Sequence, residues 1–491
     1  MKTIPEMLSF VTRRYSERTA IVDGGKAFHY STLGKRVSAL ASALYQRGIR
    51  QGDRVALLLP NGLDFVTAFF AISKAGAIAV PLNDHYQQTE LLYFLDECGV
   101  SLILTSKDFA PLCQQVLSIL KSPCRIFWAE DIENLQAESL GDLKVEMDPQ
   151  VPVMYQFSSG STGRPKRIGR THAHLLFELN SLVQALDITP EDRFLGVAPF
   201  SHVNGLMRSM MASLRAGATL YPLPRFDRQA LAETIEKNRI SIFIGVPFMP
   251  SMLAKSHFRR PPDFSSLRLC ITASAPMPQK LNQQFHEQFG IYVRQLYGST
   301  ETGTISVNLS PDIERSLDSV GTPISGVEVK VFTDEGQPAK ADEIGEVAVK
   351  SEAAIRGYHG SDEWNREAFR DGNFFTGDLG KKDGNGLLYL VGRKKFLINR
   401  GGYKIDPHEI EELLESHPRV EEAAVVGIPT SFGDEKVKAV IVLNGTCTEE
   451  QLVEYCRGKI ADFKIPSLVE FRDSLPKGPT GKIRRTMLVP E

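Results

Sequence analysis

Short apolar runs alternate with amphipathic segments along most of this chain, and this alternation limits the possible folds more than any other feature. "DRVALLL" (53–59) has the length and apolar content of a buried strand, and "GLDFVTAFFAISKAG" (62–76) has helical spacing that ends at a glycine. The strand-like run "AIAVPL" (77–82) follows directly, and similar runs recur at 240–247 and 267–276. Strand–helix–strand repeats with apolar strands predict an α/β fold of parallel-rich sheets covered by helices.

The pattern changes twice toward the C-terminus. The stretch 320–351 alternates apolar and polar residues between Asp, Glu and Gly, which predicts an antiparallel, β-barrel-like subdomain with one exposed face. Near Arg393 the pattern changes again, and Asp406-Pro407 then begins a helix with acidic residues in its first turn. We therefore predict an N-terminal domain over 1–393 and a small α+β domain over 394–491.

Composition and charge exclude several classes of function. The formal net charge of −2 gives no reason to expect nucleic acid or an anionic membrane as a partner. No apolar run approaches the about 20 residues that a membrane span needs, and the N-terminal residues show no secretory h-region. The cysteines lack a CxxC pair, which argues against structural zinc and for a reducing, cytoplasmic location; they are Cys98, Cys113, Cys124, Cys270, Cys447 and Cys456.

The stretch "FSSGSTGRPKRIGRTH" (157–172) is rich in Gly, Ser and Thr. Successive backbone N–H groups in such a turn can point inward and bind an anion, hydroxyls add donors, and Lys166 adds a charge. The stretch lacks the Walker A pattern. Its composition also fits a plain linker, but it lies between a strand-like and a helix-like segment inside a well-patterned region. From these residues alone, linker and phosphate loop both stay possible.

Six segments together resemble the signatures of the adenylate-forming enzymes, the superfamily of acyl-CoA synthetases, peptide-synthetase adenylation domains and luciferases. They occur in the family's order and cover nearly the whole chain. The segments are "SSGSTGRPK" (158–166), "APFSHVNGL" (198–206), "YGSTETG" (297–303), "FFTGDLG" (374–380), "GRKKFLINRGGYKIDPHEIE" (392–411) and "LPKGPTGKIRR" (475–485). The resemblance implies that a carboxylate attacks the α-phosphorus of ATP and that a thiol later displaces AMP. Such a site needs cations and donors placed where charge develops.

The resemblance also implies a nucleotide site. The phosphate loop would comprise Ser158, Ser159, Gly160, Ser161, Thr162, Gly163 and Lys166. Tyr297 and Gly298 would lie on one side of the adenine, and the loop Ser274, Ala275 and Pro276 on the other. Asp378 would accept both ribose hydroxyls, with Arg393 nearby. A plain Gly-Asp turn is the structural alternative for Asp378.

Further positions would be catalytic. Thr300 resembles the residue that contacts the α-phosphate, and Glu301 resembles the Mg²⁺ ligand. Lys482 would bridge the carboxylate, the α-phosphate and the ribose oxygen. A solvated side chain is the alternative for both Glu301 and Lys482. Lys395 matches the hinge about which the small domain rotates between half-reactions, and Gly401 and Gly402 would line the thiol channel.

The acyl pocket is the least determined part. His202 resembles the histidine at its mouth, with a core histidine as the alternative. The lining residues implied by the resemblance are Val203, Asn204, Arg208, Thr304 and Ile305. An aspartate that would pair with a substrate ammonium is absent from 201–204, which disfavours an α-amino acid. Arg208 either faces a polar or anionic distal group of the acid or points to solvent.

We expect an ATP- and Mg²⁺-dependent acid–thiol ligase that transfers the acyl group to CoA. The alternative acceptor is the phosphopantetheine arm of an acyl carrier protein, as for a stand-alone adenylation enzyme of a biosynthetic cluster. A nucleotide-binding scaffold without turnover is a third reading, against which Glu301, Asp378 and Lys482 argue. The partners would be a small carboxylic acid, ATP and CoA, and the enzyme would be a monomer or a homodimer.

Overall fold

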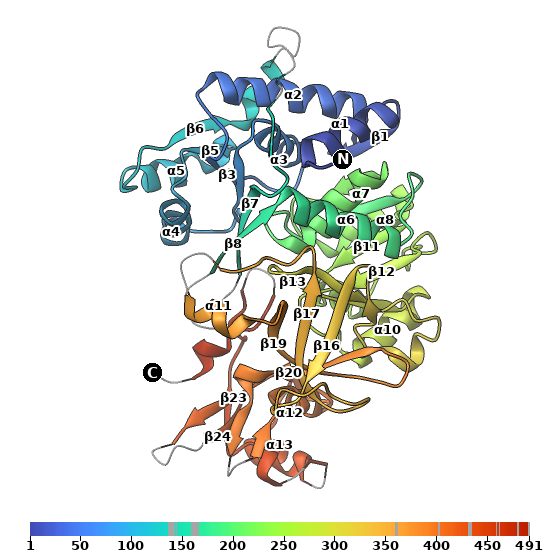
Figure 1. Cartoon of the computed structure of the whole chain (residues 1–491). Helices are drawn as coiled ribbons and strands as arrows, with labels where there is room; N and C mark the ends of the chain where they lie inside the picture. Colours follow the sequence, from blue (N-terminus) through green and yellow to red (C-terminus); the bar gives the residue numbers. More distant parts are fainter. Residues whose placement is uncertain are drawn as a thin grey trace.

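The computed structural model describes residues 1–135, 143, 145–158, 166–358, 362–400, 403–430, 435–457, 459–460, 462–478 and 481–489. Its described strands form five sheets. In Figure 1 the blue N-terminal elements lie at the top and the red C-terminal elements at the bottom. No helix in the described part of the chain is both long and apolar enough to cross a lipid bilayer.

The first sheet has six strands and is mainly parallel. Its spatial order is β6 (Arg125–Trp128), β5 (Leu102–Thr105), β3 (Arg54–Leu58), β4 (Ile78–Pro81), β7 (Pro152–Ser158) and β8 (Lys166–Thr171). The associated helices are α2 (Tyr30–Gln46), α3 (Leu63–Lys74), α4 (Gln88–Cys98) and α5 (Ala110–Leu117), with 3₁₀ turns at Lys107–Phe109 and Ala129–Asn134. The predicted strands at 53–59 and 77–82 and the helix between them are confirmed as β3, β4 and α3.

Strand β8 corrects one expectation. We expected the Gly/Ser/Thr-rich stretch to join a strand to a helix, but its second half forms β8, which pairs antiparallel with β7. The sequence of β8, "KRIGRT", contains Gly and three cations, so it has little strand propensity of its own. Its conformation therefore depends on hydrogen bonds to β7.

The second sheet has nine strands and crosses the middle of the molecule. Its order is β15 (Thr322–Pro323), β14 (Gly303–Val307), β13 (Val293–Ser299), β12 (Leu269–Thr272), β11 (Ile242–Gly245), β9 (Arg193–Gly196), β10 (Thr219–Pro222), β1 (Thr19–Asp23) and β2 (Lys26–His29). The strands from β13 to β1 in this order are parallel, and β2, β14 and β15 join antiparallel. In such a sheet, ligands bind beyond the carboxyl ends of the parallel strands.

Six α-helices and one π-helix accompany this sheet. They are α1 (Ile4–Arg14), α6 (His172–Ala185), the π-helix η4 (Asn204–Met211), α7 (Ala212–Ala216), α8 (Arg228–Asn238), α9 (Phe248–Ala254) and α10 (Gln279–Phe289). Leu, Ile, Phe and Val side chains of the first two sheets and their helices form the largest hydrophobic core.

The predicted antiparallel region is a third sheet. It contains β16 (Val327–Phe332), β17 (Gly345–Ser351), β19 (Asn373–Lys382), β18 (Phe369–Arg370) and β20 (Leu388–Arg393), with helix α11 (Asp362–Ala368) beside it. Along β16 buried and exposed residues alternate, because one face of the strand packs on the core. The expected α/β fold with a more antiparallel region is confirmed.

The C-terminal part is small and mixed, as expected. After a 3₁₀ turn at Lys394–Phe396 come β21 (Ile398–Arg400), β22 (Tyr403–Ile405), α12 (Pro407–Glu415), β23 (Val420–Pro429), β24 (Glu435–Leu443), α13 (Glu449–Cys456), the 3₁₀ turn Asp462–Lys464, β25 (Leu468–Phe471) and the 3₁₀ turn Arg485–Leu488. Asp406 caps α12 by accepting a hydrogen bond from the backbone N–H of His408. This part has its own hydrophobic core around Ile410, Val425 and Ile441.

Candidate active site

Asp378 joins three segments that lie far apart in the sequence. Its Oδ2 accepts a hydrogen bond of 2.6 Å from the hydroxyl of Tyr297 on β13. Its Oδ1 forms an ion pair of 2.6 Å with Nε of Arg393, which is its cross-strand partner on β20. Burial, and then the charge of Asp378, raise the pKa of the Tyr297 hydroxyl, so Tyr297 stays a proton donor.

Lys482 from the C-terminal loop lies within electrostatic reach of this group. Burial lowers the pKa of its ammonium, and the positive charge of Arg393 lowers it further. The carboxylates of Asp378 and Glu301 act in the opposite direction and raise the Lys482 pKa. The predicted residues Tyr297, Asp378, Arg393, Glu301 and Lys482 therefore lie in one neighbourhood, in which the Lys482 ammonium interacts electrostatically with two carboxylates.

Glu301 is held by an aromatic residue that the sequence reasoning did not identify. The hydroxyl of Tyr358 donates a hydrogen bond of 3.0 Å to Glu301 Oε1, and both residues are buried. Lys166 Nζ lies 4.4 Å from the centre of the Tyr358 ring and 4.3 Å from that of Trp364, in cation–π geometry. Lys166, the predicted cation of the Gly/Ser/Thr-rich stretch, thus lies next to Tyr358, which holds Glu301.

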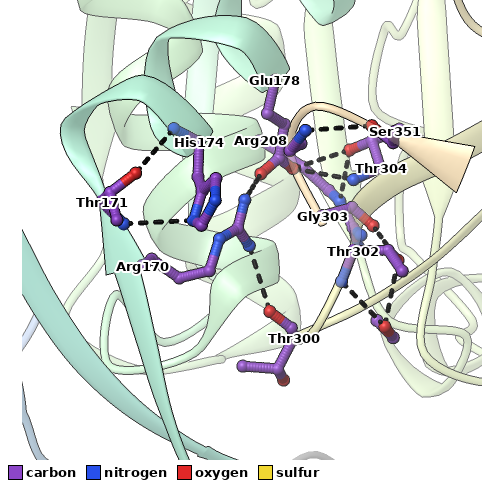
Figure 2. Close-up of polar contacts among 12 residues, drawn as sticks. Arg170, Thr171, His174, Glu178, Arg208, Thr300, Thr302, Gly303, Thr304 and Ser351 are labelled. Carbon is purple, nitrogen blue, oxygen red and sulfur yellow. Dashed lines mark hydrogen bonds and ion pairs between the residues drawn. The ribbon is translucent and has the colours of Figure 1, made fainter. Parts of the chain in front are cut away.

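Arg170 and Glu178 form a fully buried ion pair behind Thr300, as Figure 2 shows. Arg170 Nη2 lies 3.0 Å from Glu178 Oε2, and Arg170 Nη1 donates a hydrogen bond of 3.1 Å to the carbonyl oxygen of Thr300. Glu178 Oε1 accepts hydrogen bonds from the backbone N–H and the hydroxyl of Thr304, at 2.9 and 3.0 Å. This pair fixes both ends of the 300–304 segment.

The sequence contained a signal for this pair that we did not use. Glu178 interrupts the apolar face "LLFELNSL" of a predicted helix, and an acidic side chain on a buried face needs a partner. Its partner Arg170 lies within the Gly/Ser/Thr-rich stretch and could not be identified as a buried residue from local composition.

Arg208 is buried on the π-helix, with 1% of its surface exposed, so the solvent-facing alternative is wrong. Its Nε donates a hydrogen bond of 3.1 Å to the Thr304 hydroxyl, and Nη1 donates one of 3.4 Å to Asn204 Oδ1. Burial lowers the Arg208 pKa to about 10, so the guanidinium stays charged at neutral pH. Ile305 is completely buried in the largest hydrophobic core, and the partly buried Val203 packs against that core.

His202 is neutral at neutral pH. Burial lowers its pKa to about 4. Its Nε2 lies 3.4 Å from Nδ2 of Asn83, a buried residue that the sequence reasoning did not single out. His202 can therefore act as a neutral hydrogen-bonding group rather than as a cation.

The predicted adenine loop follows β12. Ser274 in this loop has φ of +80°, a left-handed conformation that a glycine adopts without strain, and Ala275 and Pro276 are exposed. Other predicted positions lie outside the described residues; they are Ser159, Gly160, Ser161, Thr162, Gly163, Gly401 and Gly402. Ser158 ends β7, and Lys395 lies in the 3₁₀ turn after β20.

Gly298 lies between Tyr297 and the Thr300 segment and is closely packed. A Cβ at this position would overlap Nη2 of Arg208 and the carbonyl oxygen of Gly303. The absence of a side chain therefore lets the Arg208 guanidinium approach the backbone of β13 next to Tyr297.

Comparison with known proteins agrees with this geometry. The profile of the AMP-binding enzymes matches residues 9–359, and that of the AMP-binding enzyme C-terminal domain matches 409–482. Feruloyl-CoA synthase of Amycolatopsis sp is 34% identical over 470 residues, covering 95% of this chain and 94% of the relative. Oxalate–CoA ligase of Arabidopsis thaliana is 32% identical over 503 residues, covering 99% and 98%.

Solved structures extend the similarity to the fold. ATP-bound MatB from Rhodopseudomonas palustris matches with a TM-score of 0.90 and 27% identity, and its apo form with 0.78. The o-succinylbenzoate CoA synthetase MenE from Bacillus subtilis, in complex with its acyl-adenylate intermediate, matches with 0.90 and 29% identity. Each alignment covers 99% of this chain and 98% of the other. The chain therefore belongs to the AMP-binding enzyme family, and it is an acyl-CoA synthetase that activates a carboxylic acid with ATP and Mg²⁺ through an acyl adenylate.

Proposed function

We propose that the group around Asp378 binds the nucleotide and that Lys482 and the Thr300–Glu301 segment carry out acid activation. The observation that supports this most is the convergence on Asp378. Tyr297 and Arg393 each contact one of its oxygens, and Lys482 lies within reach of its charge. A carboxylate with two fixed donors keeps further lone pairs, which can accept the ribose hydroxyls.

The first half-reaction joins the acid to AMP. A carboxylate oxygen of the acid attacks the α-phosphorus of ATP, the bond from that phosphorus to the bridging oxygen of the β-phosphate breaks, and pyrophosphate leaves. The Lys482 ammonium would hold the two approaching anions together, and the Thr300 hydroxyl would contact the α-phosphate. A cation positioned where negative charge develops stabilises that charge.

Glu301 fits the role of a Mg²⁺ ligand. Within the described residues no group of three or more His, Cys, Asp or Glu side chains could hold a metal by itself. A single carboxylate suits Mg²⁺, which usually takes one or two protein carboxylates together with phosphate oxygens and water. When bound, Mg²⁺ would neutralise phosphate charge. Tyr358 would orient Glu301 through its hydrogen bond to Oε1.

The second half-reaction makes the thioester. The sulfur of CoA attacks the acyl carbonyl carbon, the bond from that carbon to the phosphate oxygen of AMP breaks, and the thiol proton goes to solvent. We propose that the small domain, 394–491, rotates about Lys395 to bring Gly401 and Gly402 to the thiol path. An acyl carrier protein stays the second candidate acceptor, because its phosphopantetheine arm ends in the same thiol.

The substrates in the names of the relatives do not identify one class of carboxylic acid for this chain. Feruloyl-CoA synthase and oxalate–CoA ligase bear the names of an aromatic and a dicarboxylic acid, and they are similarly distant from this chain. We propose a small carboxylic acid that enters beside His202, an enzyme that is a monomer or homodimer, and a reducing compartment such as the cytoplasm. The six cysteines, all free thiols, support the last point.

Replacement of Asp378 by Ala tests the nucleotide site. Loss of hydrogen bonds to a charged group should raise the KM for ATP about 10- to 100-fold in an acid-dependent pyrophosphate-release assay. Asp108→Ala, at an exposed position of the Lys107–Phe109 turn, is the matched control and should leave the KM unchanged. Circular dichroism verifies folding. An unchanged KM in folded Asp378→Ala would contradict the assignment.

A further inference from the structure

One nitrogen of the Arg208 guanidinium, Nη2, donates no hydrogen bond to any described residue. Nε and Nη1 donate to Thr304 and Asn204, but Nη2 is buried and has no hydrogen-bond partner among the described residues. A buried charged donor without a partner is destabilising, so such a group is usually completed by a ligand or water.

The unpaired Nη2 lies against the catalytic segment. It lies beside Gly298, where even a Cβ would overlap it, and the next residue on the N-terminal side is Tyr297. Asn204, the partner of Nη1, donates in turn to the carbonyl oxygen of Gly245 at the carboxyl end of β11. This is the edge of the second sheet at which a ligand of a parallel sheet binds.

A second buried polar atom at this edge also lacks a partner within the described part of the chain. Thr272, 1% exposed, ends β12, and its Oγ1 makes no hydrogen bond. Thr272 is the register partner of Gly245 on the neighbouring strand. The edge therefore offers an unpaired hydroxyl in addition to an unpaired guanidinium nitrogen.

The charge around Arg208 is not balanced. Glu178 uses Oε2 for Arg170 and Oε1 for Thr304, as Figure 2 shows. The Thr304 hydroxyl donates to Glu178 and so can only accept from Arg208. Arg170 and Glu178 neutralise each other in direct contact, while Arg208 reaches Glu178 only through this hydroxyl. The cluster of Arg170, Glu178 and Arg208 thus carries one surplus positive charge in a buried place.

We propose that this acyl-CoA synthetase acts on dicarboxylic acids, and that Arg208 Nη2 binds the carboxylate that does not react. The inference rests on the proposed function, because it assumes that the acid occupies the space beside Gly298. A second carboxylate would give Nη2 the hydrogen-bond acceptor that it lacks. It would also add the one negative charge that balances the cluster of Arg170, Glu178 and Arg208. A guanidinium binds a carboxylate through strong, charge-assisted hydrogen bonds.

The test compares matched acids with the wild-type protein. Pyrophosphate release is measured for aliphatic and aromatic dicarboxylic acids, for monocarboxylic acids of the same size, and for the monomethyl ester of each diacid. We expect at least one diacid to exceed its monoacid and its half-ester by about 100-fold or more in kcat/KM, because a buried site built for a polar group discriminates strongly. Equal use of a diacid and its half-ester would overturn the proposal.

Arg208→Met separates this inference from the proposed function. The change removes the surplus charge and leaves the Arg170–Glu178 pair intact, so we expect a thermal midpoint equal to or above that of the wild type. The diacid preference should disappear, so that kcat/KM for the preferred diacid falls to that of its half-ester. Arg215→Met, a half-buried position on α7 whose Nε contacts Asn180, should keep the preference.

The outcomes distinguish two failures. A diacid activity that stays unchanged in folded Arg208→Met would overturn the dicarboxylate assignment but leave acid activation intact. Absence of pyrophosphate release with every acid would overturn the proposed function itself. Should the variant not fold, the wild-type comparison of each diacid with its half-ester decides alone.

Discussion

Charged side chains that lie close together determine how this site works at the scale of single residues. The pKa of Lys482 shows this most clearly, because both cations and carboxylates lie near its ammonium group. Burial and the charge of Arg393 lower its pKa below that of an exposed lysine, although Asp378 and Glu301 partly compensate. The ammonium form exists below this pKa and is lost as the pH rises through it. The adenylation rate should therefore fall with rising pH before exposed lysines titrate.

Replacement of Lys482 by Ala tests the division of labour between the half-reactions. We expect adenylation to fall to background, because the ammonium that brings the carboxylate and the α-phosphate together is gone, while thioester formation from supplied acyl-AMP survives. The two half-reactions are measured separately. Lys477→Ala is the matched control, since Lys477 lies in the same loop but pairs with Glu422. Equal loss of both half-reactions would refute the division.

The sequence identified the motif residues but not what holds them. Tyr297, Asp378 and Lys482 were predicted because each belongs to a recognisable local signature. Arg170 and Glu178 belong to no such signature, and their importance depends on Thr300 and Thr304, which only the folded chain brings close to them. The orientation of Arg208 was likewise undetermined, because both a buried and a solvent-facing position fit a helix.

At the scale of elements, the π-helix Asn204–Met211 is the feature that shapes the acyl side of the site. A local pattern of apolar residues in the sequence does not distinguish π from α geometry. Gly205 explains why the helix can begin where it does. A Cβ there would overlap the backbone carbonyl oxygens of Ala198 and Pro199, so only glycine fits against this loop.

Gly205→Ala should therefore disturb the start of the π-helix. We expect the free energy of unfolding to fall by about 1–3 kcal/mol, as for other overpacked sites, together with slower pyrophosphate release from the preferred acid because Asn204 and Arg208 shift. Urea denaturation and pyrophosphate release measure the two effects. Gly384→Ala is the control, since nothing lies within 4 Å of a Cβ there. A Gly205→Ala protein as stable and active as this control would contradict the packing argument.

Strand β8 shows the limit of local patterns at this scale. Its cations and glycine gave no strand signal, and it forms because its backbone completes the ladder with β7. The strands β3, β4, β11 and β12 were predicted correctly because they are buried, and burial leaves a continuous apolar run in the sequence.

At the scale of the whole molecule, the C-terminal part lies against the large domain in one particular arrangement. Gly481, next to Lys482, approaches the ring of Phe248 on α9, and Lys255 after α9 lies 3.9 Å from Glu421 on β23. The TM-score is 0.90 with ATP-bound MatB and 0.78 with apo MatB, so this arrangement resembles the ATP-bound form more. The domain division at 393/394 and the rotation about Lys395 stay predictions.

A covalent cross-link between α9 and β23 can hold the C-terminal part against the large domain. In a protein whose native cysteines are replaced by Ser, Lys255→Cys and Glu421→Cys are joined by a short bis-maleimide. We expect adenylation to persist and thioester formation from supplied acyl-AMP to fall to background, because the small domain can no longer rotate. Reaction of each single-cysteine protein with the reagent is the control. Unimpaired thioester formation in the cross-linked protein would exclude the rotation.

Exchange of labelled pyrophosphate into ATP tests the central claim most directly. With wild-type protein, Mg²⁺ and an acid panel that includes dicarboxylates, we predict exchange that requires the acid but not CoA, since the acyl adenylate forms reversibly before the thiol enters. Added CoA should then release AMP and thioester in equal amounts. Formation of ADP and phosphate, or AMP formation that requires CoA and shows no exchange, would contradict an acyl-adenylate mechanism.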